Sequence, residues 1–342
     1  MAYTTINKST LYFNDKFYTG NGGTNAQTGV GFQPDWTWIK NRSGADMHSL
    51  YDSVRGVNKV LRTNGTNAES TQTDGLTAFG ADGFTVGASG SVNTNSNNFA
   101  SWNWKANGSS SSNTDGSITS TVSANTTSGF SIVTYTGTGA NATVGHGLGS
   151  AAKMIFFKGT NNASGNWYVY HSSLGHGTRI TLNSNGASAS DTEYMNNTAP
   201  TSSVFSLGAN GTTNPSGGTQ IAYCFAEKTG YSKFGTYTGN GADDGAFIYT
   251  GFKPKLVIVK EYGATGNWIM KYDFIKNQND SYLLPNDGAG EASGSVVGFD
   301  LLSNGFKLRG TAGDSNGSGA NILYMAFGQS LVGSNNVPCT AF

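Results

Sequence analysis

Histidine is the residue type in this chain best suited to acid–base or metal chemistry, and four are present: His48, His146, His171 and His176. The last two stand five positions apart in the segment HSSLGH, but no further ligand follows at a spacing that a zinc site requires. The segment GHGLGS at 145–150 lacks the Lys-Ser/Thr pair of a phosphate-binding loop. The sequence therefore favours turn and surface positions for these histidines.

Paired carboxylates could carry glycoside hydrolysis, which uses two acidic side chains across a cleft. Asp52 and Asp273 recur at matching places in the chain, where His171 stands in the second copy. An acidic residue repeated in this way is more often a turn or a cap than a catalytic group. We therefore expect no enzyme and no cofactor. The acidic residues considered are Asp52, Asp82, Asp243, Asp244, Asp273, Glu291 and Asp300.

Calcium binding is left open by the sequence. The pair Asp243 and Asp244, or Asp287, could supply oxygen ligands, but no EF-hand or nonapeptide calcium loop is present.

Tryptophan rings beside amide side chains form a third pattern, because sugars stack on aromatic faces. Trp167 and Trp268 each follow Gly-Asn, and these two are the candidate glycan contacts. A tryptophan repeated in the core explains the same pattern. The remaining four occur in pairs two residues apart within strands, so each pair shares a face and is expected in the core: Trp36, Trp38, Trp102 and Trp104.

An internal repeat determines where these residues lie. Residues 18–40 read YTGNGGTNAQTGVGFQPDWTWIK, and residues 237–260 read YTGNGADDGAFIYTGFKPKLVIVK. A third copy at 132–158 reads IVTYTGTGANATVGHGLGSAAKMIFFK. Each copy contains an apolar segment that ends in lysine, at Lys40, Lys158 or Lys260.

Three modules follow from this repeat. The expected boundaries are 1–106 for repeat 1, 129–228 for repeat 2 and 229–331 for repeat 3, with a Ser/Thr/Asn-rich flexible linker at 107–128 and a tail at 332–342. Short apolar runs between frequent turn residues, with 49 glycines, favour strands over helices. The expected fold class is all-β, with three tandem β-sandwich modules of jelly-roll or lectin-like type.

A G-F-x-P unit occurs before the apolar strand in repeats 1 and 3. We expect a tight turn at Gly31 to Pro34 and again at Gly251 to Pro254. The glycine would adopt positive φ, the phenylalanine would enter the core, and the proline would be the first residue of the strand.

Charge balance, apolar runs and cysteine positions bear on four possibilities: a nucleic-acid partner, a membrane span, secretion and a disulfide. Lys+Arg and Asp+Glu number 20 each, and this balance argues against a nucleic-acid partner. No apolar run approaches the roughly 18 residues of a membrane span, and no secretory signal is visible. Cys224 alternates within an apolar strand and is expected to be buried, while a disulfide between Cys224 and Cys339 is left open.

Long motifs of this chain resemble a family of virion-associated β proteins of tailed bacteriophages, common in phages of marine bacteria and carrying a domain of unknown function. The motifs include GFQPDWTWIKNRSG, HSLYDSVRG, SIVTYTGTGANATVGHGLG and IAYCFAEKTGYSKFGTYTGNG, and the resemblance covers nearly the whole chain. It implies a particle protein in the virion, such as a head decoration, an appendage or a tail fibre component. It supplies no catalytic residues. The chain has no coiled-coil or β-helical shaft, so a compact component is favoured over a long fibre.

The expected function is therefore a non-enzymatic structural protein on the virion surface. Its expected partners are other capsid or tail proteins and further copies of itself in a homo-oligomer, and a contribution to host attachment through a surface glycan is left open. The alternative is a carbohydrate-binding receptor-recognition protein at a tail fibre tip. A polysaccharide depolymerase is the least favoured reading.

Overall fold

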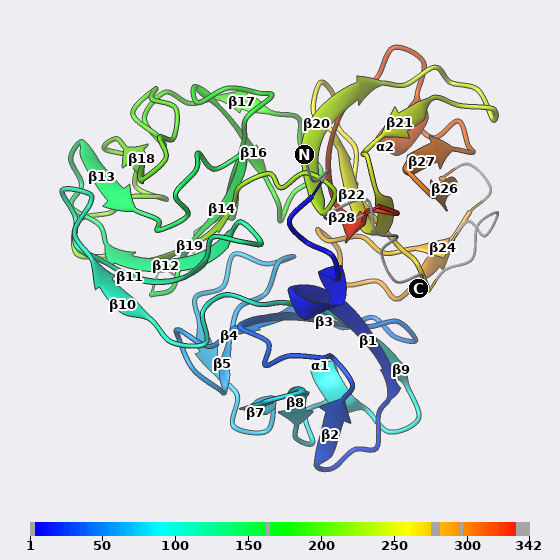
Figure 1. Ribbon diagram of the computed structural model, residues 1–342, viewed down its shortest axis with the longest axis horizontal. Helices are drawn as coiled ribbons and strands as arrows, with labels where there is room; N and C mark the ends of the chain where they lie inside the picture. The colour runs from blue at the N-terminus through cyan, green and yellow to red at the C-terminus, as the bar shows by residue number, and fades with distance from the viewer. Residues whose placement is uncertain (1–3, 162–164, 275–280, 295–296, 333–342) are drawn as a thin grey trace.

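The fold is all-β, as the sequence predicts (Figure 1). The computed structural model describes residues 4–161, 165–274, 281–294 and 297–332. Within these ranges every ladder between named strands is antiparallel, and the only helical pieces are short: η1 (Ser9–Leu11), α1 (Gly90–Asn93) and α2 (Gly313–Asn316). No helix in the described ranges is long and apolar enough to cross a membrane.

Each repeat builds a principal sheet with the same strand order. In repeat 1 the order is β1 (Phe13–Thr19), β9 (Asn98–Trp104), β3 (Trp36–Asn41) and β4 (Ser49–Asp52). In repeat 3 it is β20 (Ser232–Thr238), β28 (Asn321–Gln329), β22 (Lys253–Glu261) and β23 (Trp268–Tyr272). In repeat 2 the corresponding strands are β12 (Phe130–Thr136), β19 (Thr219–Phe225), β14 (Met154–Gly159) and β15 (Tyr168–His171).

Repeat 2 extends its principal sheet on both edges. The added strands are β10 (Ser111–Asn113) and β11 (Ser120–Asn125) beside β12, and β16 (Thr178–Thr181) and β17 (Ala189–Ser190) beside β15. The prediction of a flexible linker at 107–128 is therefore wrong where this segment forms β10 and β11. Strand β11 pairs with β12 in a continuous register, with Thr121 opposite Thr134. The polar composition of the segment did not indicate strand β11, whose Val122 side chain is buried.

A smaller sheet faces one side of each principal sheet. These sheets are β2 (Asn25–Thr28), β8 (Gly83–Val86) and β7 (Leu76–Gly80) in repeat 1; β13 (Ala142–Gly145) and β18 (Val204–Leu207) in repeat 2; and β21 (Phe247–Tyr249), β27 (Gly305–Leu308) and β26 (Phe299–Leu302) in repeat 3. The two sheets of a repeat enclose their own hydrophobic cluster. Two hairpins complete the strands: β5 (Lys59–Val60) with β6 (Ser70–Thr71), and β24 (Ser281–Tyr282) with β25 (Ala292–Ser293).

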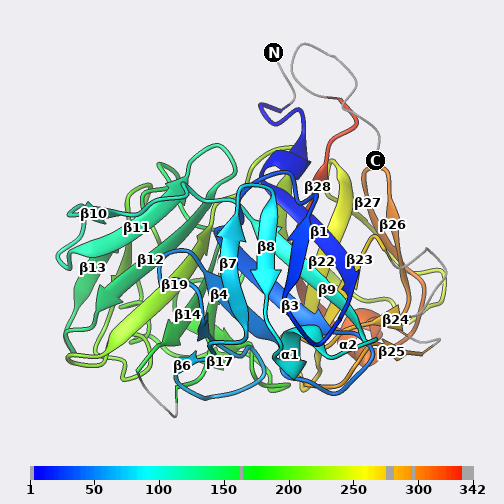
Figure 2. The same ribbon diagram turned by 90° about the horizontal axis from the view of Figure 1, so that it is seen from below.

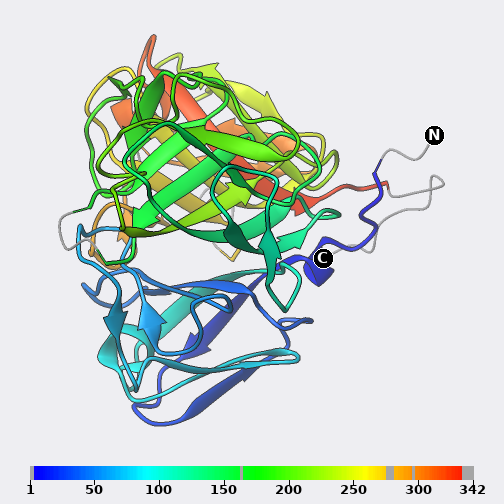
Figure 3. The same ribbon diagram turned by 90° about the vertical axis from the view of Figure 1, so that its left-hand side faces the viewer.

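The opposite faces of the three principal sheets share a single hydrophobic cluster, here called the central core. The three repeats surround it, coloured blue to cyan, green, and yellow to red in Figure 1. Viewed from the side, repeat 1 packs beneath the other two (Figure 3). The central core contains all six tryptophans, each at most 1% exposed. Its aromatic contacts cross between repeats, for example Trp36 with Tyr223 at 4.5 Å between ring centroids and Trp104 with Phe327 at 5.6 Å.

Burial on both faces explains why the strands before Lys40, Lys158 and Lys260 are continuously apolar. One face of each strand enters the cluster of its own repeat, and the other face enters the central core. A strand with one solvated face would show alternation of apolar and polar residues instead.

The first described residues and the end of β28 lie on the same side of the molecule (Figure 2). The Ser9 amide donates to the Gln329 side-chain oxygen at 2.5 Å, so the segment that precedes β1 in repeat 1 is attached to the last strand of repeat 3.

The G-F-x-P turns follow the expectation for the glycine and the phenylalanine. Gly31 has φ +92° and Gly251 has φ +86°. The phenylalanine after each glycine is buried, at 3% exposure for Phe32 and 1% for Phe252. The prediction that the proline is the first residue of the strand is wrong. Pro34 precedes β3, which begins at Trp36. Pro254 is the second residue of β22, where a register shift accommodates a residue that cannot donate to the ladder.

Replacing Gly251 by valine in the full chain should lower the free energy of unfolding by roughly 1–3 kcal/mol, because a β-branched residue resists φ > 0. Gly211→Val is the matched control, since that glycine has no positive φ and an added Cβ meets nothing within 4 Å. Denaturant unfolding of both variants measures the difference. Equal stabilities would show that the glycine recurs without a structural need.

Candidate functional site

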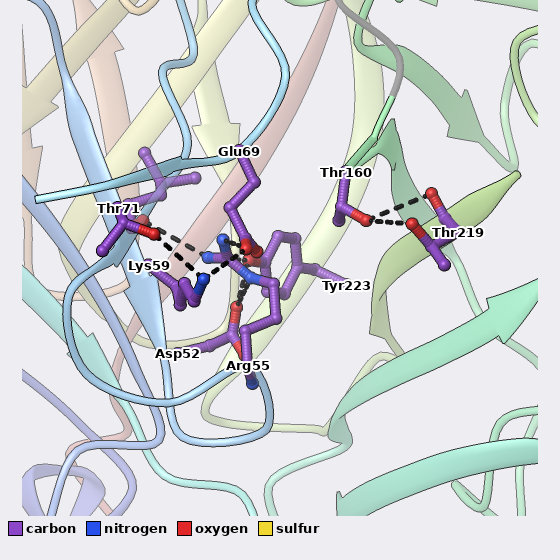
Figure 4. A network of polar contacts seen from close by, with 9 residues as sticks. Asp52, Arg55, Lys59, Glu69, Thr71, Thr160, Thr219 and Tyr223 are labelled. Carbon is purple, nitrogen blue, oxygen red and sulfur yellow. Dashed lines mark hydrogen bonds and ion pairs between the residues drawn. The ribbon is translucent and has the colours of Figure 1, made fainter.

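A buried cluster of charged side chains lies at the junction of repeats 1 and 2 (Figure 4). Arg55 is its centre: its Nε lies 2.5 Å from Asp52 Oδ2, and its Nη1 lies 3.1 Å from Glu69 Oε2. The Tyr223 hydroxyl, from β19 of repeat 2, donates to Asp52 Oδ2 at 2.7 Å. Lys59 adds a looser contact to Glu69 at 3.6 Å. We call these five residues the Arg55 cluster.

Local chain geometry positions the two central residues of this cluster. Asp52 ends β4, and its carboxylate accepts the Arg55 amide at 2.8 Å, which fixes the turn that follows the strand. Glu69 is held by its amide, which donates to the Thr160 carbonyl of repeat 2 at 2.8 Å. The cluster therefore joins two repeats through both side chains and backbone.

Burial and neighbouring groups shift the pKa values of Arg55 and Tyr223 in this cluster. The Arg55 side chain is 5% exposed and the Asp52 side chain 0%. Burial opposes the charge on Arg55, but Asp52, Tyr223 and Glu69 outweigh it and raise the pKa of the guanidinium. Burial also raises the pKa of Tyr223 well above its ordinary value. Both carboxylates form ion pairs with the same guanidinium. We interpret the cluster as a brace between repeats.

A cleft of about 400 Å³ lies next to this brace. Arg55 and Val54 line one part of it, and the Thr160 and Thr219 hydroxyls, 2.7 Å apart, line another (Figure 4). Such a surface can form hydrogen bonds to water or to hydroxyl groups, but its lining includes no nucleophile paired with a base. The other threonines of the cleft are Thr119, Thr121, Thr134 and Thr136.

The prediction that Trp167 and Trp268 could contact a glycan is wrong, because both side chains are 0% exposed. The Trp167 indole donates to the Arg62 carbonyl of repeat 1 at 2.7 Å. The Trp268 indole donates to the Thr181 carbonyl of repeat 2 at 3.0 Å. Their recurrence after Gly-Asn reflects contacts between repeats, and neither ring can stack on a ligand.

Histidine takes the place of this tryptophan in repeat 1. The His48 amide bonds the Asn64 side chain, just as Trp167 bonds Asn183 and Trp268 bonds Asn286. The His48 Nε2 atom lies 3.0 Å from the Leu284 carbonyl of repeat 3. Each repeat thus uses the same position to bond the next one, and the three bonds form a closed ring around the central core.

The three repeated lysines form a second ring of contacts. Lys40 Nζ donates to the Gly288 carbonyl of repeat 3 at 2.9 Å, Lys158 Nζ to Thr66 of repeat 1 at 2.9 Å, and Lys260 Nζ to Asn185 of repeat 2 at 3.3 Å. All three lysines are fully buried, and burial lowers the pKa of each ammonium group to about 8. Sequence reasoning found these lysines but not their partners.

An expected surface position is wrong for three of the four histidines, whereas a turn role holds for two of them, since the Nδ1 atoms of His146 and His171 each accept the amide two residues on. His48, His146 and His171 are fully buried. The His171 ring lies 3.2 Å from the Tyr324 carbonyl of repeat 3, and the His146 ring lies 3.2 Å from the Thr201 carbonyl. No group of three or more His, Cys, Asp or Glu residues in the described ranges could hold a metal ion.

The alignment of Asp52 with Asp273 and the burial of Cys224 can also be compared with the structure. Strand register places Asp52 opposite Trp36, His171 opposite Met154 and Tyr272 opposite Leu256, so the match of Asp52 with Asp273 is displaced by one residue. Cys224 is a fully buried thiol with no disulfide partner among the described residues, and burial raises its pKa. Cys339 lies outside the described residues.

Replacing Arg55 by methionine should lower the free energy of unfolding by about 3–5 kcal/mol, because Asp52 would stay buried without its partner. Lys59→Met is the control, since that ion pair is exposed and should contribute under about 1 kcal/mol. The double variant Asp52→Asn/Arg55→Met should recover part of the loss. Urea unfolding measures all three, and an Arg55→Met variant no weaker than Lys59→Met would contradict the brace.

The buried histidines predict loss of stability in acid. Burial lowers the pKa of His48 to about 3 and of His171 to about 4, from an ordinary 6.5. At a pH between the folded and the unfolded pKa of a histidine, the unfolded chain binds more protons than the folded one. The free energy of unfolding therefore falls as the pH drops through about 6.5. Asp273, whose pKa burial and Asp15 raise to about 8, acts in the opposite sense.

Comparison with a variant isolates one histidine from these other groups. From pH 7 to pH 5, His171→Gln should lose about 2 kcal/mol less unfolding free energy than the native chain. Urea titrations at both pH values test this. Parallel pH profiles of the two proteins would contradict a buried neutral His171.

Comparison with known proteins yields one match. A family model described as a domain of unknown function, DUF7483, matches residues 8–330, which include all three repeats. No curated protein and no solved structure matches the chain. The chain therefore belongs to the family of this domain of unknown function, DUF7483.

Proposed function

We propose that this protein is a non-enzymatic structural component of the surface of a tailed bacteriophage particle, such as a head decoration, an appendage or a compact fibre component. The observation that carries the structural part is the central core, in which three repeats bury all six tryptophans against one another. The proposed location on a phage particle rests on the resemblance of the long sequence motifs to virion proteins.

We further propose that each repeat is a β-sandwich module of jelly-roll or lectin-like type. The principal and small sheets of each repeat, with a hydrophobic cluster between them, support this description.

The polar interactions suit a part that must persist outside a cell. Contacts between repeats rely on buried groups, as in the Arg55 cluster and the ring of lysine–carbonyl bonds. Buried pairs are screened by salt much less than exposed ones. A shared core also opposes local opening and slows unfolding.

An enzymatic role receives less support from the described residues. Several acidic side chains are held in ion pairs: Asp52 and Glu69 with Arg55, Glu291 with Arg42, Asp191 with Arg179, Asp300 with Arg309, and the adjacent Asp15 and Asp273 with Lys255. A polysaccharide depolymerase would require two carboxyl groups facing a cleft in different protonation states. We therefore do not propose hydrolysis.

Particle composition tests the proposal. Mass spectrometry of gradient-purified phage particles should detect the protein at a copy number comparable to that of other structural proteins, and its partners should be capsid or tail proteins and further copies of itself. A non-structural protein from the same infected lysate serves as the control for contamination. Presence in the lysate together with absence from the purified particles would contradict the proposal.

A further inference from the structure

Repeat 3 exposes two aromatic side chains on the outer face of its small sheet. In β21, Phe247 is 44% exposed and Tyr249 is 54% exposed, while Ile248 between them is 7% exposed and packs inward. Alternation along the strand places both rings on one face, about 7 Å apart.

The other two repeats show that the fold does not need these rings. Ile248 pairs with Phe306, Gln27 with Phe84 and Val144 with Phe205, which aligns the three edge strands. At the Phe247 and Tyr249 positions, repeat 1 has Ala26 and Thr28, and repeat 2 has Thr143 and Gly145. Folding therefore tolerates small residues there, and the two rings are specific to repeat 3.

Neighbouring residues hold the rings in place. The Phe247 ring lies across Gly305, where an added Cβ would come within 2.8 Å of the ring carbon Cζ. The Lys233 ammonium donates to the Tyr249 carbonyl at 3.2 Å and lies 5.3 Å from the centroid of the Tyr249 ring. Fixed rings lose little conformational freedom when a ligand stacks on them.

A pocket of about 330 Å³ continues from this platform. Tyr249, Leu331 and Val332 form its apolar walls, and Ser303 and Asn304 are the exposed polar residues of its lining. No acidic or basic side chain is among its described lining residues. This composition matches a neutral ligand that has both an apolar face and hydroxyl groups.

We propose that Phe247, Tyr249 and this pocket form a binding site for a neutral saccharide. The apolar face of a sugar ring would stack on Tyr249, its hydroxyl groups would reach Ser303 and Asn304, and the next sugar of an extended chain would meet Phe247. The pocket lining has no charged side chain to pair with a phosphate or a carboxylate, and the nearby Lys233 ammonium is bonded to the Tyr249 carbonyl. This site goes beyond the proposed structural role and does not depend on it.

The test uses the full chain and a printed array of neutral hexose, pentose and N-acetylhexosamine oligosaccharides. The native protein should bind at least one class, and calorimetric titration with the best-bound member gives its affinity. The variant Phe247→Ala/Tyr249→Thr carries the residues of repeat 1 and should bind at least tenfold more weakly with an unchanged melting temperature. Met47→Gln, at an apolar side chain of repeat 1 that is 38% exposed, is the matched control and should bind normally.

Protection of Tyr249 provides a second readout on the native protein. The bound saccharide should slow nitration of Tyr249 by tetranitromethane, followed by peptide mass spectrometry. Absence of binding to every member of the array would overturn the proposal, as would equal affinity in the double variant or unprotected Tyr249. A concentration-dependent dimer that the double variant abolishes, without saccharide binding, would assign the surface to a second copy of the chain and also overturn it.

Discussion

The packing of six tryptophans between three sheets is the constraint on which the rest of the structure depends. Each principal sheet covers its own small sheet on one face and the other two repeats on the opposite face, so its central strands must be apolar throughout. A single repeat would expose the central-core side of its sheet to water. Full burial of one large apolar side chain contributes about 1.5–3 kcal/mol, so the shared core links the stability of every repeat to the presence of its neighbours.

Polar groups at this core are satisfied by the neighbouring repeat. The His48, Trp167 and Trp268 rings, and the ammonium groups of Lys40, Lys158 and Lys260, each bond a backbone carbonyl of the next repeat in the same cyclic direction. A buried donor without a partner costs about 1–3 kcal/mol, so these bonds specify how the repeats dock as well as stabilising them. The arrangement resembles a cyclic trimer joined into one chain, in which each interface can vary separately. The Arg55 cluster joins repeats 1 and 2, and among the described edge strands β2, β13 and β21 the exposed aromatic rings are those of β21 in repeat 3.

Sequence reasoning succeeded where a property is local to one strand or turn. Period-two spacing placed Trp36 and Trp38 in the core, and the G-F-x-P motif indicated positive φ at Gly31 and Gly251. It failed where the partner lies in another repeat. Trp167 and Trp268 resembled a sugar platform because the carbonyls that their indoles bond, Arg62 and Thr181, are 105 and 87 residues away in sequence, beyond any short-range pattern. A detectable signal did exist: Asn64, Asn183 and Asn286 recur after His48, Trp167 and Trp268 and bond their amides.

Differential scanning calorimetry of the full chain tests the central claim, that the three repeats share one core and unfold together. The account predicts a single transition in which the van't Hoff enthalpy equals the calorimetric enthalpy, at about 0.7 kcal/mol per residue over the whole chain. Two or three resolved transitions, or a van't Hoff enthalpy near one third of the calorimetric value, would show that the repeats unfold independently and would contradict it.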